Sequence, residues 1–170
     1  MGNKIFALAR VAISCCIAMA AYNAEAATGE KGLHLGKPLT TGELFHLYQG
    51  RSWLWKDGAG YFSSKQRRFT AWTSAGEKAS VGDGRWFLTD PGKLCFKADW
   101  RAGSGSASAL TCFSHRWKGS DVYQRREPDG EWYLFKHSSL KSADEYAKLV
   151  RGDYVSNRFR AYSARSEVTD

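Results

Sequence analysis

The chain has 170 residues and a formal net charge of +8 at pH 7; 43% of its residues are hydrophobic and 25% are charged. A length of this order fits one domain with one core rather than several domains. Beyond residue 26, no segment approaches the roughly 20 apolar residues of a membrane-spanning helix. The positive charge favours anionic partners such as lipopolysaccharide, anionic lipid or acidic polysaccharide. It can equally serve only to keep a small protein soluble.

Residues 1–26 have the pattern of a secretory signal peptide. Lys4 and Arg10 give a basic start, residues 11–21 are apolar but too few to span a bilayer, and Ala24-Glu25-Ala26 is a small-x-small cleavage site. Cleavage there leaves 170 − 26 = 144 residues, and the net charge becomes 23 − 16 = +7. We expect a periplasmic or secreted protein with at most peripheral membrane contact. Export makes nucleic acid a poor partner.

The leader contains two of the four cysteines, so Cys95 and Cys112 remain in the mature chain. In an oxidising compartment, two cysteines most simply form one disulfide. Metal binding is the rival interpretation, but neither a C-x-x-C pair nor a neighbouring histidine at ligand spacing supports it.

A disulfide would also fix the pairing of two strands. If Cys95 and Cys112 face each other, paired positions sum to 207 and residues 102–105 connect the strands. The apolar positions 94, 96, 98 and 100 then share the core face. Cys95, Lys97 and Asp99 share the opposite face, so the disulfide is expected to join the hairpin from outside.

Helical signals flank the central part of the chain. Residues 27–38 are small and polar, and we expect a flexible lead-in. Thr40 and Glu43 form a capping box, apolar positions 44, 47 and 48 share one helical face, and Gly50 should end this helix. A second capping box at residues 142–145 predicts a helix up to Gly152. Residues 154–170 are expected to be a polar, Arg-rich tail.

Between these helices, short aromatic and β-branched runs alternate with turn residues, which is typical of antiparallel strands. We expect strands near 51–56, 59–64, 67–73, 84–89, 93–100, 109–117, 120–126 and 131–137. Two copies of D-G-x-W-aromatic-L, at residues 83–88 and 129–134, predict that Asp83-Gly84 and Asp129-Gly130 each reverse the chain. Residues 39–153 should therefore be one mainly β domain, an antiparallel meander curled into a small, lipocalin-like barrel.

The sequence gives little support for catalysis. It has no G-x-S-x-G elbow and no histidine cluster with metal spacing. Most of its prominent aspartates fall in predicted turns, where the side chain caps its own backbone. We therefore expect no enzyme, no cofactor and no metal.

Binding has more support, because aromatic residues make up 14% of the chain and many of them alternate with basic residues. Aromatic rings can stack on sugars or acyl chains while cations hold phosphate or carboxylate. Alternatively, the tryptophans fill the core and the cations are the solvent faces of half-buried strands, which we favour for Trp86, Trp100 and Trp132. Both interpretations stay open for the candidate ligand-binding residues, which are Trp53, Trp55, Arg67, Arg68, Trp117, Arg125 and Arg126.

Several blocks between Leu39 and Asp153 carry a resemblance to a known family. They are W-x-W-x-D-G-x-G-Y-F (53–62), F-x-A-W (69–72), G-R-W (84–86), L-C-F (94–96) with Trp100, C-F (112–113), Tyr123 and G-x-W-Y (130–133). The chain resembles small exported alphaproteobacterial proteins, of the kind found in rhizobia, described only as a domain of unknown function. The resemblance implies an envelope setting and the Cys95–Cys112 pair, but no reaction or ligand.

The sequence therefore predicts a non-catalytic envelope protein that binds an anionic or amphipathic component such as lipid, lipopolysaccharide or acidic glycan. An inhibitor or scaffold of another periplasmic protein is the alternative.

Overall fold

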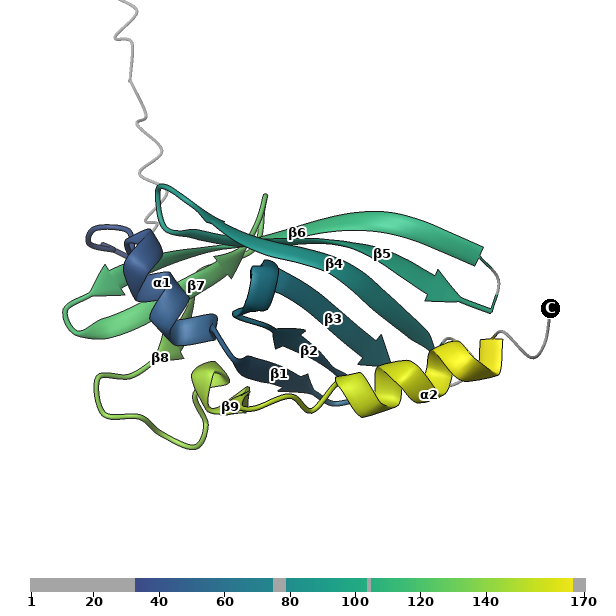
Figure 1. Cartoon of the computed structure of the whole chain (residues 1–170). Coiled ribbons are helices and arrows are strands. Elements are labelled where there is room, and N and C mark those ends of the chain that lie inside the picture. The colour runs from purple at the N-terminus through teal and green to yellow at the C-terminus, as the bar shows by residue number, and fades with distance from the viewer. Residues whose placement is uncertain (1–32, 75–78, 104, 167–170) are drawn as a thin grey trace, which may run out of the picture. The chain divides into compact units, whose positions relative to one another are not determined.

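Nine antiparallel strands form one sheet that curls into a half-barrel (Figure 1). The computed structural model describes residues 33–74, 79–103 and 105–166. The strands are β1 (Arg51–Trp55), β2 (Gly58–Phe62), β3 (Arg68–Thr73), β4 (Ser80–Thr89), β5 (Lys93–Ala102), β6 (Gly105–Lys118), β7 (Asp121–Arg126), β8 (Tyr133–Lys136) and β9 (Leu149–Arg151). Each of β1 to β7 pairs with the next strand in the chain, and β9 returns to pair with β1. The predicted mainly β meander is confirmed, as a half-barrel.

The concave face of the sheet holds the core, and helix α1 (Thr41–Tyr48) packs into it. The predicted capping box forms, since the Thr40 side chain accepts from the Glu43 N–H and the Glu43 carboxylate accepts from the Thr40 N–H. Leu44 and Tyr48 of α1 are fully buried against Phe62 and Trp86 of the sheet. Burial of this apolar stripe is what stabilises so short a helix.

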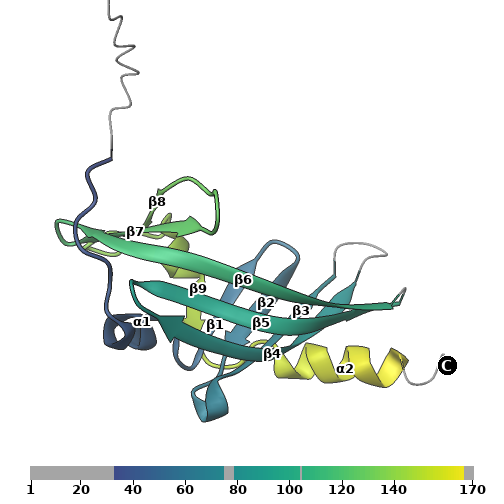
Figure 2. The same ribbon diagram turned by 90° about the horizontal axis from the view of Figure 1, so that it is seen from above.

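The convex face carries the second helix, α2 (Ser156–Ser166), which contacts β3 and β4. Val155 is fully buried just before it, Arg158 lies over the Trp72 ring, and the Tyr162 hydroxyl donates to the Ala79 carbonyl. Figure 2 shows α1 and α2 near opposite ends of the strands. Helix α1 therefore covers one end of the concave face, and α2 covers the opposite end of the convex face.

The predicted hairpin register is confirmed. Cys95 pairs with Cys112, the two form a disulfide, and Leu94 pairs with Phe113. Leu94 and Ala98 are buried on the core side, whereas Lys97 is exposed on the other side. Cys95 belongs to the outer face, as expected, but it is only 4% exposed.

One predicted reversal is wrong, because Asp83-Gly84 lies inside β4 rather than in a turn. A Cβ on Gly84 would overlap the Lys97 carbonyl of β5, so the glycine allows a close backbone approach within the sheet. In contrast, Asp57 does lie in the β1–β2 turn, and Asp129 in the β7–β8 connection.

The predicted helix at 142–150 is also wrong. Residues Glu145–Lys148 form only a 3₁₀ turn, and Leu149–Arg151 form β9. Asp144 does not cap a helix; its carboxylate accepts from the backbone N–H groups of His137 and Lys141. Leu149 is buried in the core and pairs with Trp53, which requires extended backbone.

The described parts of the two expected flanking segments, residues 33–38 and 154–166, make specific hydrogen bonds. In the expected polar tail, the Asp153 carboxylate accepts from the N–H groups of Val155 and Ser156, where α2 begins. In the expected lead-in, Gly36 and Leu39 donate backbone hydrogen bonds to β6, and Pro38 forms an isolated bridge with Arg116.

Gly84→Ala should lower the free energy of unfolding by about 2–3 kcal/mol, because β5 must move to accommodate the new methyl group. Gly103→Ala is the matched control: no atom lies within 4 Å of the place where its Cβ would be, so its effect should stay within about 0.5 kcal/mol. Urea unfolding measures both. Equal effects of the two substitutions would contradict the role given to Gly84.

The double variant Cys95→Ser, Cys112→Ser should lose about 3 kcal/mol of stability, since the disulfide closes a loop with a sequence separation of 17. Urea unfolding with and without reductant measures this. A reductant should destabilise the wild type and leave the double variant unchanged; an unaffected wild type would show that the disulfide is absent.

Candidate functional site

Five aromatic side chains line the part of the concave face that α1 does not cover. We call them the concave aromatic surface: Trp53 and Trp55 of β1, Phe96 and Trp100 of β5, and Phe113 of β6. Trp55 is 40% exposed, and the other four are partly exposed. Within the surface, the rings of Trp53 and Phe113 are 5.2 Å apart. Packing therefore fixes these rings while leaving part of each in contact with solvent.

Glycines in the neighbouring strands let the outer two tryptophans lie on the sheet. A Cβ on Gly82 would meet three Trp100 ring atoms at 3.0, 3.0 and 3.2 Å, so the flat face of the indole covers the Gly82 Cα. Trp55 covers Gly58 in a similar way, with its indole nitrogen 2.5 Å from where a Cβ would be. A ring that lies flat on the backbone turns its second face away from the sheet.

The two ends of this surface are connected by a row of small residues. Trp53 pairs with Gly60, Gly60 with Ala71, Ala71 with Gly82, and Gly82 with Trp100. Four strand spacings of ~4.8 Å separate Trp53 from Trp100 by about 19 Å along the curved sheet. No side chain in the row between them is larger than a methyl group.

Polar groups lie beside this surface. The Trp53 indole N–H donates to the Glu145 carboxylate at 2.9 Å, and Glu145 is also paired with Lys148. Arg126 of β7 pairs directly with Phe113 and is exposed. One predicted cation, Arg126, therefore lies at the edge of the surface that contains the predicted tryptophans Trp53 and Trp55.

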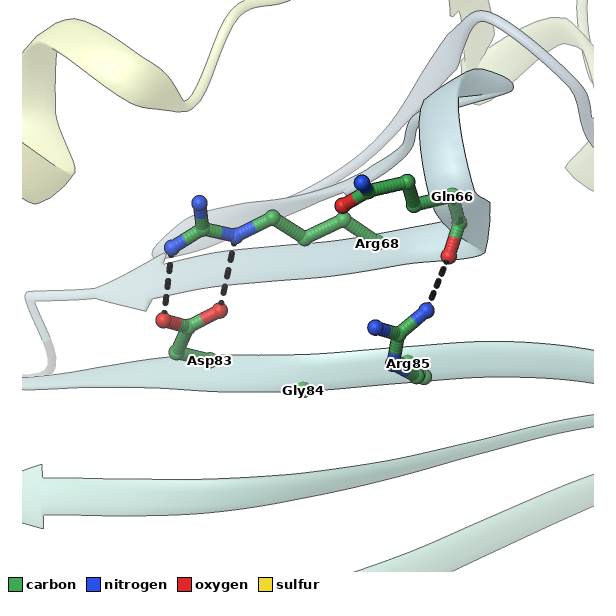
Figure 3. Close-up of a pocket in the computed structure, with 5 residues that line it drawn as sticks. All are labelled: Gln66, Arg68, Asp83, Gly84 and Arg85. Atoms are coloured by element: carbon green, nitrogen blue, oxygen red, sulfur yellow. Dashed lines mark hydrogen bonds and ion pairs between the residues drawn. The ribbon is translucent and has the colours of Figure 1, made fainter.

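A separate pocket of about 340 Å³ lies on the convex face (Figure 3). Arg68 makes a bidentate ion pair with Asp83, at 3.0 and 2.7 Å, and these contacts raise the pKa of Arg68. Arg85 donates to the Gln66 carbonyl at 2.6 Å. Figure 3 shows the side chains of Asp83 and Arg85 extending from β4 towards β3, with Gly84 between them. Gln66 has a positive φ of 53°, which places this carbonyl towards Arg85.

Three cations stand in one row at this pocket, because Arg68 pairs with Arg85 and Arg85 pairs with Lys97. Like charges directly opposite each other destabilise a sheet. Asp83 neutralises Arg68, which leaves Arg85 as the positive group of the pocket, with Lys97 beside it on β5. The convex face can therefore attract anions independently of the concave aromatic surface.

The remaining predicted residues lie elsewhere. Arg67 stacks over the Phe45 and Trp86 rings, at 4.4 and 4.6 Å. Trp117 packs against the core. Arg125 pairs with Glu127 at 3.2 Å and lies 5.0 Å from the centre of the Trp132 ring. Trp86 is buried, as expected, whereas Trp100 and Trp132 are only half-buried. The predicted residues thus do not form one site.

A buried polar cluster was not identified from the sequence. Gln124 donates to the Tyr48 hydroxyl at 2.7 Å, and that hydroxyl lies 2.8 Å from His115 Nε2. His115 Nδ1 faces the Gly92 carbonyl, so Nδ1 carries the proton and Nε2 accepts. The Tyr133 hydroxyl extends the cluster by donating to the Gln124 carbonyl. The sequence pattern that could have indicated this cluster is the alternation of side chains between the two faces of a strand, which places His115 on the same face as Phe113 and Trp117.

Burial controls the protonation of this cluster. His115 is fully buried, and the loss of hydration lowers its pKa to about 3, although backbone carbonyl groups oppose the shift. Burial also raises the pKa of Tyr48. The cluster is therefore neutral near pH 7, and each of its polar groups has a partner. It satisfies hydrogen bonds at the junction of α1 with β6 and β7.

Within the described part of the chain, no three His, Cys, Asp or Glu side chains gather in a way that could hold a metal ion. None of the described helices is both long and apolar enough to cross a membrane.

These features define a mainly β half-barrel domain with an aromatic concave face and a basic pocket on its convex face. The chain belongs to the family described as "Protein of unknown function (DUF995)", which matches residues 14–155. No curated protein matches the chain, and no solved structure does. The family description carries no activity, so function has to be argued from the surfaces themselves.

His115→Gln should make the stability less sensitive to mild acid. Below pH 6.5 the unfolded chain binds a proton on this histidine that the native state excludes, so wild-type stability should fall by about 2 kcal/mol between pH 7 and pH 5. Urea unfolding at several pH values measures the slope. His46→Gln, which changes an exposed histidine of α1, should keep the wild-type slope. If the wild type and His115→Gln have the same slope, the histidine is not excluded from protonation.

Proposed function

We propose that this protein is an exported, non-catalytic binding module for an anionic amphipathic component of the cell envelope. Its concave aromatic surface receives the apolar or ring-containing part of that ligand. The observation that carries the proposal is the Trp100 indole lying flat on Gly82, with the ring partly exposed. This geometry offers a stacking face that is already in place before a ligand arrives.

The arrangement suits an elongated apolar group. An acyl chain or a sugar ring gains dispersion and hydrophobic contact from each aromatic face, worth roughly 0.5–1.5 kcal/mol per favourable ring contact beyond the buried area. The strip between Trp53 and Trp100 is itself buried, because the Phe69 ring lies over Gly60 and the Trp100 ring over Gly82. The ligand would therefore contact the exposed parts of the rings rather than the backbone between them. Little side-chain entropy is lost on binding, because the rings are already held by packing.

The positive charge of the chain is the reason for proposing an anionic group in the ligand. The net charge, +7 after loss of residues 1–26, raises the local concentration of anions, and Arg126 stands at the edge of the concave aromatic surface beside Phe113. A headgroup phosphate or carboxylate could pair with this guanidinium while the apolar part contacts the tryptophans.

An envelope location rests on two supporting features. Residues 1–26 have the pattern of a secretory signal peptide, and Cys95 and Cys112 form a disulfide, a bond that persists in oxidising compartments. We therefore propose the periplasm as the site of action.

Trp100→Ala should weaken binding of dodecyl phosphate, added below its micelle concentration, by about tenfold, because the stacking face over Gly82 is lost. Trp100→Phe should lose less. Isothermal titration calorimetry measures the affinity, and thermal unfolding shows whether each variant is folded. Tyr154→Ala is the control, since Tyr154 is a 58% exposed aromatic residue outside the concave aromatic surface.

Dodecyl maltoside and inorganic phosphate separate the two parts of the ligand. Dodecyl phosphate should bind more tightly than either. Added salt should weaken its binding, because salt screens the attraction between the phosphate group and the cations of the protein. If dodecyl phosphate binds wild type and Trp100→Ala equally well, or binds no better than inorganic phosphate, the proposal fails.

The second candidate is an inhibitor or scaffold of another envelope protein. It is favoured by an edge of β6 that no described strand covers, since β7 pairs with β6 only from Phe113 onwards. An unpaired edge can accept an extended segment of another chain. Cross-linking and pull-down from a periplasmic extract distinguish this function from small-ligand binding.

A further inference from the structure

Half of β6 is a sheet edge. β6 pairs with β5 from Gly105 to Ser114, whereas its pairing with β7 covers only Phe113 to Lys118. Among the described residues, none pairs with the other side of residues 105–111. At ~3.4 Å per residue, this open stretch is about 24 Å long. All of residues 105–110 are exposed, and β6 extends well beyond the end of β7, whereas β4 stays paired with β5 as far as Ala102 (Figures 1 and 2).

The direction of the backbone groups along this edge follows from the disulfide. The Cα atoms of Cys95 and Cys112 are 4.1 Å apart, the close spacing of a pair that exchanges no backbone hydrogen bonds. In agreement, the Cys112 carbonyl points to the other side and accepts from the Glu127 N–H at 2.9 Å. Since direction alternates along a strand, the N–H and C=O groups of Ser106, Ser108 and Leu110 also point away from β5.

Proteins normally protect such an edge with a lysine, a proline, a bulge or a covering segment. Residues 105–112 contain no charged residue and no proline. The uncharged stretch extends over the 13 residues 102–114, in a chain where 25% of the residues are charged. This part of the sheet is therefore suited to pairing with another uncharged strand.

We propose that the edge of β6 pairs with the same edge of a second copy of this chain, which joins two half-barrels through one continuous antiparallel sheet. The same edge of a second copy supplies the uncharged strand that this pairing requires. Two copies that each carry a net charge of +7 after loss of residues 1–26 repel one another, and this repulsion is smallest where the facing strands carry no charge. The small side chains of Ser106, Ala107 and Ser108 also let a second backbone approach to the spacing of a strand.

The structure limits the register of this pairing. β7 ends at Arg126, and the following Glu127 already bonds to Cys112, so a second strand beside β6 must stop before that point. A two-fold axis near Ala107 satisfies this limit. It places Ser106 of each copy opposite Ser108 of the other, so that outward-pointing N–H and C=O groups face each other. The two concave aromatic surfaces would then belong to one sheet.

Proline at position 108 tests the inference without disturbing β5. The Ser108 N–H points away from β5, so Ser108→Pro removes an edge donor and leaves the β5–β6 ladder intact. Ser108→Ala is the matched control, because it removes only the hydroxyl that donates to Asp99. Analytical ultracentrifugation of the exported, oxidised protein over a wide concentration range measures association.

Wild type and Ser108→Ala should approach twice the monomer mass as concentration rises, and Ser108→Pro should dimerise at least about tenfold more weakly. Added salt should strengthen the dimer by screening its net charge, the opposite of its effect on anion binding. A wild type that stays monomeric, or a Ser108→Pro variant that dimerises like wild type, overturns the proposal. Dodecyl phosphate binding is a separate readout, so this inference and the proposed function can fail independently.

Discussion

The packing of α1 into the concave face is the contact on which the rest of the structure depends. Leu44 and Tyr48 are fully buried there, and the Tyr48 hydroxyl joins His115 and Gln124 in the core. A helix of 8 residues is only about 12 Å long, whereas β6, with 14 residues, extends for about 48 Å. One helix of this length cannot cover the whole face, so the part of the sheet farther from α1 has to be completed differently.

The part of the sheet that α1 does not cover is covered instead by aromatic rings that lie on glycines. Trp55 over Gly58 and Trp100 over Gly82 shield backbone that would otherwise be open, while keeping one ring face towards the concave side. The open edge of β6 has a different origin. β7 has 6 residues and β6 has 14, so β7 leaves much of β6 without a neighbour on that side.

The sequence was sufficient wherever short-range chemistry decides the structure. Turn residues indicated eight strands, although β4 begins at Ser80 rather than near residue 84. The Thr40 capping box located α1, and the pair Cys95 and Cys112 fixed the hairpin register. It failed where distant contacts override a local pattern. Ser142 to Glu145 resembles a helix start, but the burial of Leu149 beside Trp53 requires a strand. Asp83-Gly84 resembles a turn, but the close approach of β5 uses this glycine inside a strand.

The candidate site was predicted only in part for a related reason. Alternation correctly placed Trp100 on the core side and left Trp53 open between core and ligand binding, because it does not show how much of that side is filled. The cations Arg67, Arg68 and Arg125 are dispersed because each has its own partner: the Trp86 ring, Asp83 and Glu127. The disulfide also has a consequence for strand register. It links β5 to β6 next to the point where β7 ends, which is where β6 loses its second neighbouring strand. Oxidation therefore prevents β6 from slipping along β5 in the stretch where only one side of β6 is hydrogen-bonded.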